Sequence, residues 1–150
     1  TAGAIAALVR AQNEPSDAQL IEVLGGLVGG CLGAAAPDWL EPATSPRHRA
    51  VCHSEAEVVA CIQVSRRSLV RWELWWRTQS LRLEQECSSL EPGSWMFIVK
   101  RILALLCRAL AGTLAGFAAG YVSHISLDAM TPMGIGLLGS LSRRAALAPI

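Results

Sequence analysis

Two long apolar runs separated by a polar, arginine-rich section make up most of this chain. Residues 19–36 form the first run, which Glu22 interrupts and Pro37 stops. Residues 102–122 form the second run, in which Arg108 is the single interruption. A helix needs about 20 apolar residues to cross the hydrocarbon core of a bilayer, so the second run is long enough and the first is slightly short. We expect both runs to be helices, and we expect Arg108 to face a partner, a cavity or water, because a charge at mid-span is costly.

Both runs carry glycine at every fourth position. The two series are Gly25, Gly29 and Gly33, and Gly112, Gly116 and Gly120. Glycine weakens a helix by about 1 kcal/mol per residue relative to alanine, so the repetition needs a structural reason. Small residues at this spacing let the backbones of neighbouring membrane helices approach closely. The pattern therefore predicts close helix packing in a membrane, with a soluble bundle rich in alanine and glycine as the alternative.

The section between the runs combines a loop with a long helical pattern. Residues 37–50 contain three prolines and no periodicity, whereas hydrophobic residues recur at near-helical spacing from about Ser54 to Gln85, before a turn at 88–95. Arginine and tryptophan are interleaved along this pattern, at Arg66, Arg67, Arg71, Trp72, Trp75, Trp76, Arg77 and Arg82. Such a mixture is typical of a helix at the membrane surface or of a binder of single-stranded nucleic acid. The apolar flanks and the net charge of only +1 favour the membrane surface.

Composition points the same way. The 150 residues suffice for one domain, residues 1–150, with a real core. Hydrophobic residues make up 52% of the chain and charged residues 17%, against about 25% charged residues in soluble proteins. We therefore predict an all-α, membrane-embedded bundle of three to four helices with membrane lipid as its surroundings, and no nucleic-acid partner.

The candidate chemistry lies at the ends of the apolar runs. The chain has only three histidines and three aspartates. All of these histidines and two of the aspartates follow or flank an apolar run: Asp38, His48, His53, His124 and Asp128. If residues 54–85 return toward the other side of the bundle, both groups meet at one end. His124 and Asp128 are one helical turn apart and can reach one ion, although an ordinary polar pair at a helix end is the alternative for these two alone.

Imidazole and carboxylate ligands suit zinc, and also Mn or Fe. The five residues predict a divalent metal site with room for a water molecule, whose pKa falls to about 7 on the metal. Asp38 or Asp128 could also serve as a general base. Arg49 could hold a substrate phosphate through paired hydrogen bonds, or it could pair with Asp38 or Glu41 instead.

Three short motifs carry a resemblance to a known family. The segments are "APD" at 36–38, "HRAVCHS" at 48–54 and "GYVSHISLDAMTPMG" at 120–134. Together they resemble the YdjM-type membrane-bound metal-dependent hydrolases. The resemblance implies an integral membrane protein of the bacterial inner membrane whose metal ligands are Asp38, His48, His53, His124 and Asp128. The His-x-x-x-Asp pair is also similar to a motif of the helical zinc phospholipase C and P1-nuclease group, which implies hydrolysis of a phosphoester or phospholipid.

The chain departs from the family pattern at several positions. Residues 1–12 contain no histidine, although many members have one there, and Leu40 and Glu41 replace a second aspartate and a histidine. These changes are compatible with a mononuclear site, with Glu41 as a substitute ligand, or with an inactive member. The predicted function is metal-dependent hydrolysis in the membrane. The alternative is a non-catalytic membrane protein whose metal is structural.

Overall fold

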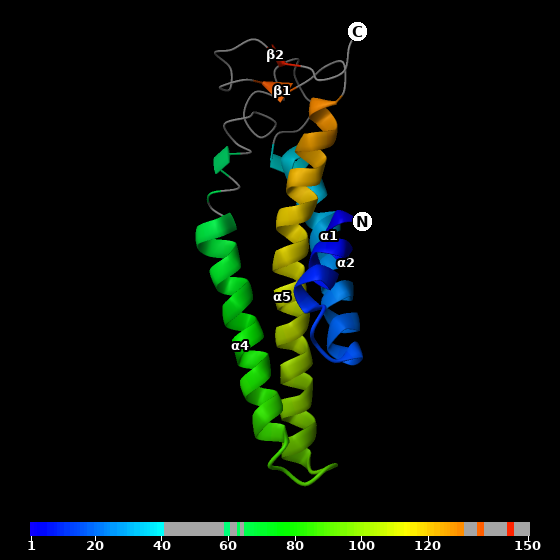
Figure 1. The fold of residues 1–150 in the computed structure, drawn as a ribbon, viewed down its shortest axis with the longest axis vertical. Helices are drawn as coiled ribbons and strands as arrows, with labels where there is room; N and C mark the ends of the chain where they lie inside the picture. Colours follow the sequence, from blue (N-terminus) through cyan, green and yellow to red (C-terminus); the bar gives the residue numbers. More distant parts are fainter. Residues whose placement is uncertain (41–58, 61–62, 64, 131–134, 137–143, 146–150) are drawn as a thin grey trace.

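The computed structural model describes residues 1–40, 59–60, 63, 65–130, 135–136 and 144–145. Its helices are α1 (Ala2–Ala11), α2 (Ser16–Leu40), the π-helical turn η1 (Ser65–Leu69), α4 (Val70–Cys87) and α5 (Trp95–Ala129) (Figure 1). The strands β1 (Ile135–Gly136) and β2 (Arg144–Ala145) add one short antiparallel ladder. The described residues thus form an all-α bundle with four α-helices, which confirms the predicted fold class.

α2 and α5 lie side by side and run in the same direction (Figure 1). Gly112 of α5 lies against the backbone of Glu22 in α2. Gly120, eight residues further along α5, lies against Gly30, eight residues further along α2. The two helices therefore advance together, and their C-terminal ends lie at the same end of the bundle.

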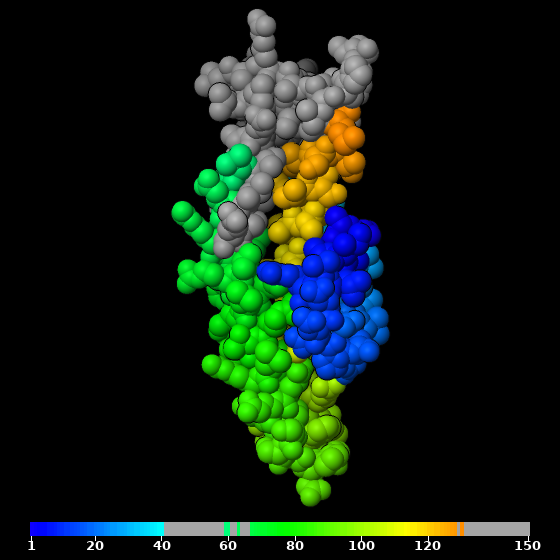
Figure 2. Space-filling model, in the orientation of Figure 1, coloured from blue at the N-terminus to red at the C-terminus, as the bar shows by residue number. Residues whose placement is uncertain are grey.

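α4 and α1 cover different sides of α5. α4 leads through a short turn into α5 and runs antiparallel to it, and the Ser80 hydroxyl of α4 donates to the Ala104 carbonyl oxygen of α5 at 3.0 Å. α1 folds back on α2, with Gly3 against Gly26 and Gly30. Figures 1 and 2 show α4 on one side of α5 and the α1–α2 pair on the other. α4 (Val70–Cys87) thus runs in the direction that the sequence analysis assumed for residues 54–85, over the part of that range that the structure describes.

The glycine series forms the contact between α2 and α5. A Cβ atom added at Gly29 would collide with the Thr113 carbonyl group, 2.8 Å from its carbon atom. At Gly33 the added atom would meet the Phe117 carbonyl carbon at the same distance. Real Cβ atoms do not approach backbone atoms this closely, so the two helices can pack at this separation only because these positions are glycine. The predicted close packing is confirmed.

The helix limits differ from the sequence prediction at specific residues. α5 is longer than the apolar run, since the Ser94 side chain caps its start by accepting from the Phe97 amide at 3.2 Å. It ends at Ala129, just before the Thr131-Pro132 pair. The prediction that Pro37 stops the first helix is wrong, because α2 continues through it to Leu40. Pro37 removes the amide donor that would bond to the Gly33 carbonyl, and the helix continues for only three residues beyond it.

The outer surfaces of α2 and α5 are apolar. Both helices are long and apolar enough to cross a membrane, with mean hydropathies of 1.6 and 1.9. Only 39% and 33% of their most apolar segments are buried inside the bundle. Exposed large side chains include Leu20, Leu24, Leu27, Val28 and Leu32 on α2 and Ile102, Leu103, Leu106 and Leu110 on α5. The core helix of a soluble protein would instead turn most such residues inward.

Arg108 is fully buried at the centre of this bundle, and the expectation that it faces a partner is confirmed. Its guanidinium group donates to Glu22 Oε1 at 3.0 Å, to Glu14 Oε2 at 2.8 Å and to Glu84 Oε2 at 3.2 Å. These carboxylates come from α2, from the turn before it and from α4. One arginine therefore holds three parts of the chain together, with its donors aimed at carboxylate oxygens.

The ion pairs continue from Glu22 toward α1. Arg77 of α4 binds both oxygens of Glu22, at 2.8 and 2.6 Å, and also contacts Glu73 at 3.3 Å. Arg10 of α1 then binds both oxygens of Glu73, at 3.0 and 2.7 Å. We call these residues the buried ion network: Arg10, Glu14, Glu22, Glu73, Arg77, Glu84 and Arg108. It links α1, α2, α4 and α5 along the stretch of α4 between Glu73 and Glu84.

Candidate metal centre

Three of the predicted site residues lie together where α2 and α5 end. His124 Nε2 is 3.7 Å from Asp38 Oδ1 and 3.5 Å from Asp128 Oδ2. Asp38 belongs to the last turn of α2, whereas His124 and Asp128 are one turn apart in α5. The parallel packing of the two helices is what delivers Asp38 to His124, because residues about 86 apart in sequence share one level. His124 is thus flanked by one carboxylate from each helix.

A small apolar cluster fixes the two helices at this level. Ala36 of α2 packs with Tyr121 and Ile125 of α5, all buried, and Phe117 lies against them. Phe117, Tyr121 and Ile125 are spaced by four and share one face of α5. The structure buries Tyr121, which lies three residues before His124 in α5. The fourfold spacing of bulky residues next to the glycine series is the signal that could have identified this support.

The three side chains differ in exposure, and this affects what each can do. The carboxylate of Asp38 is 63% exposed, whereas the side chains of His124 and Asp128 are 21% and 13% exposed. Both nitrogen–oxygen distances exceed those of a hydrogen bond. An imidazole and two carboxylates are donor types that zinc, manganese and iron accept. The chemistry of this donor set therefore suits a divalent metal.

The described residues do not complete such a site. In the ranges that the structure describes, no group of three or more His, Cys, Asp and Glu side chains is arranged to hold a metal ion. His48 and His53, the other two predicted ligands, lie outside the described residues, as do Arg49 and Glu41. The convergence of all five ligands therefore stays a prediction.

No protein-family model, curated protein or solved structure matches this chain. The resemblance to the YdjM-type hydrolases accordingly rests on the three sequence motifs, and the geometry at His124 stands beside it as a separate observation.

Proposed function

We propose that this chain is a membrane protein in which His124, Asp38 and Asp128 contribute to a divalent metal site, zinc first, that hydrolyses a phosphoester or phospholipid. The observation that carries the proposal is the position of His124, within 3.7 Å of carboxylate oxygens from two different helices. A bound metal would lower the pKa of a water molecule toward 7 and supply hydroxide at neutral pH.

The side chains around His124 suit different tasks in this proposal. Asp128 is the more buried carboxylate and is attached to the same rigid helix as His124, which suits a ligand. Asp38 is more exposed and can exchange a proton with water, which suits a general base. Arg49 is the proposed clamp for a substrate phosphate, on the strength of the family motif alone.

The membrane setting is supported by the surface of the bundle. Two helices are long enough and apolar enough to cross a bilayer, and less than half of the most apolar segment of each is buried inside the bundle. The sequence resemblance adds the bacterial inner membrane as the location. The tightly packed glycine contact between α2 and α5 is of the kind that membrane helices use.

Metal analysis of the purified full chain tests this proposal. We expect about one equivalent of metal to be lost in His124→Ala and in Asp128→Asn, together with hydrolysis of phosphoester and phospholipid substrates. Removing a direct ligand should lower metal affinity by at least tenfold, since even outer partners of ligands have effects of this size. Asp17→Asn is the matched control, because Asp17 lies in the first turn of α2 and pairs with Arg101 far from His124.

The outcomes separate the proposal from its main alternative. A wild-type chain without bound metal would exclude both a catalytic and a structural metal. Metal that is lost in His124→Ala along with thermal stability, in a wild type that hydrolyses none of the substrates, would favour a structural metal in a non-catalytic membrane protein. Equal metal loss in Asp17→Asn would show that the effect is not specific to this end of the bundle.

A further inference from the structure

The two faces of α4 have different chemistry. The inner face, toward α5, carries the buried residues Glu73, Ser80 and Cys87 at a spacing of seven. The outer face carries Trp72 and Trp75, which are 55% and 46% exposed although tryptophan is strongly apolar. The inner face is accounted for by the bundle, but nothing in the described part of the chain covers the outer face.

The arginines of the described helices follow the same division. Those facing the bundle or its ends are all paired with carboxylates: Arg10, Arg77, Arg101 and Arg108. Arg67, Arg71 and Arg82 are exposed and make no ion pair with any residue that the structure describes. All three belong to η1 or α4. The outer face of this segment therefore presents positive charge together with large aromatic side chains.

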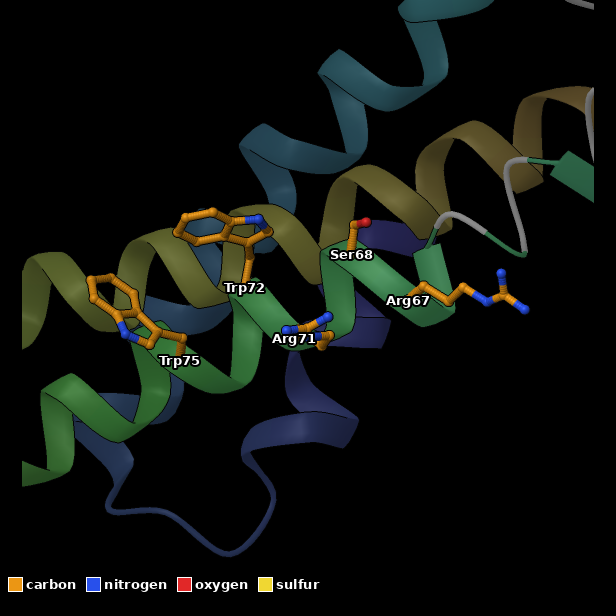
Figure 3. A pocket seen from close by; sticks show the side chains of 5 residues that line it. All are labelled: Arg67, Ser68, Arg71, Trp72 and Trp75. Carbon is orange, nitrogen blue, oxygen red and sulfur yellow. The ribbon is translucent and has the colours of Figure 1, made fainter.

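Two of these arginines line a pocket with the tryptophans. The pocket has a volume of about 650 Å³ and is lined by Arg67, Ser68, Arg71, Trp72 and Trp75 (Figure 3). These residues occupy little more than two successive turns, so their side chains emerge on one side of the segment. The indole rings of Trp72 and Trp75 are arranged edge to face, with their centroids 5.9 Å apart. The pocket thus combines guanidinium and hydroxyl donors with an aromatic wall.

We propose that this pocket binds the headgroup of an anionic phospholipid. Arg67 and Arg71 can hold phosphate oxygens through paired, charge-assisted hydrogen bonds, and the Ser68 hydroxyl can add another. Trp72 and Trp75 can pack against the glycerol and the first carbons of the acyl chains, as tryptophan does where membranes meet water. The ligand class follows from this combination of charge and apolar surface.

The position of α4 argues for a lipid over other anions. The proposal rests on the membrane setting proposed above, and it is independent of the metal site. α4 runs beside α5, whose exposed residues Leu103, Leu106 and Leu110 form an apolar surface that lipid would contact. An unpaired arginine next to hydrocarbon is costly, so it needs an anionic partner. A lipid phosphate can pair with the arginines while its acyl chains stay in the hydrocarbon of the bilayer.

Two other partners fit less well. A second copy packed about a twofold axis on this face would bring arginine against arginine, because no carboxylate lines the pocket among the described residues. Single-stranded nucleic acid could stack on the tryptophans, but a chain of net charge +1 gives such a polyanion little long-range attraction.

Binding of short-chain lipids to the detergent-solubilised full chain tests the proposal. Dihexanoyl phosphatidylglycerol and dihexanoyl phosphatidylcholine are titrated separately, and tryptophan fluorescence reports occupancy because Trp72 and Trp75 line the pocket. We expect tighter binding of phosphatidylglycerol, weakened roughly tenfold to hundredfold in Arg67→Gln/Arg71→Gln, as the loss of charge-assisted hydrogen bonds predicts. Arg82→Gln is the matched control, since Arg82 is also exposed on α4 and pairs with no carboxylate among the described residues, but is not one of the residues that line the pocket.

A second pair of variants tests the aromatic wall, with native mass spectrometry as the readout. Trp72→Ala should weaken phosphatidylglycerol binding. Trp95→Ala should not, because Trp95 is exposed at the first residue of α5, away from the pocket. Unchanged binding in both pocket variants would overturn the proposal. So would inorganic phosphate or a short oligothymidine binding at the same site as tightly as phosphatidylglycerol. His124→Ala should keep lipid binding, so failure of the metal proposal and failure of this one are told apart.

Discussion

Replacing Arg108 by leucine should destabilise the bundle more than any single change at its surface. Arg108 is fully buried and donates to three carboxylates. Leucine fills part of the space but leaves those oxygens without this donor. Breaking a buried ion pair by removing one partner costs about 3–5 kcal/mol. That is a large share of the about 5–15 kcal/mol by which folded domains are stable.

The remaining contacts place the cost within that range. Glu22 is fully buried, but both of its oxygens still bind Arg77 after the substitution. Glu14 and Glu84 have side chains that are 22% and 23% exposed, so water can reach them. We therefore expect about 3 kcal/mol, the lower end of the range. The network already holds four carboxylates against three guanidinium groups, and losing Arg108 enlarges this excess of negative charge.

A charge-compensated variant makes the reasoning refutable. Arg108→Leu/Glu22→Gln removes one charge of each sign and should be less destabilised than the sum of the two single variants by at least about 1 kcal/mol. Unfolding in mixed micelles, followed by far-ultraviolet circular dichroism, gives the free energies. A cost below about 1 kcal/mol for Arg108→Leu, or strictly additive single effects, would refute the claim that this network holds the helices together.

Two further predictions concern packing and pH. Gly29→Ala should lower the free energy of unfolding by about 1–3 kcal/mol despite the better helix propensity of alanine, because its Cβ meets the Thr113 carbonyl. Gly93→Ala, in an open turn with φ of 89°, is the control and should cost only backbone strain of about 1 kcal/mol. A Gly29→Ala variant that is more stable than wild type would contradict the packing. A hydrogen bond from Arg108 holds the pKa of Glu14 below its usual value, so Glu14 contributes stability above the ordinary glutamate pKa of about 4.3, and this is lost as the pH falls through the lower folded value. Acid unfolding curves of Glu14→Gln should be flatter than wild type in that window, and identical curves would contradict the coupling.

Sequence patterns predicted the packing of the helices better than the contacts of their charged residues. Glycine at every fourth position identified the contact surface of α2 and α5, because close approach of two backbones requires residues without a side chain. Arg108 could be predicted to need a partner, since the cost of a bare buried charge is general. Its partners Glu14 and Glu22 could not be named, because they lie 94 and 86 residues away and only the fold brings them near.

The candidate site divides in the same way. His124 and Asp128 are adjacent because of helix geometry, which any helical pattern implies. Asp38 reaches them only because α2 and α5 are parallel and in matching register. The sequence could predict this parallel arrangement only by assuming that the segment between the two helices runs antiparallel to them, as α4 does. The continuation of α2 through Pro37 was missed because proline was taken to end the helix, whereas α2 continues for three more residues.

The parallel arrangement of α2 and α5 has a consequence for how such a bundle sits in a bilayer. Two parallel membrane-spanning helices require the chain between them to return across the same thickness, and α4 is the described element that runs antiparallel beside α5. α4 is too polar to face hydrocarbon unaided, since it carries Glu73, Arg77 and Glu84 on one side and Arg71 on the other. The inner charges are neutralised by α1, α2 and α5 through the buried ion network. Arg71 has no carboxylate partner among the described residues, and the lipid proposed above would supply an anion to it. In this bundle α4 runs antiparallel to α2 and α5, and the parallel packing of those two helices places Asp38 beside His124.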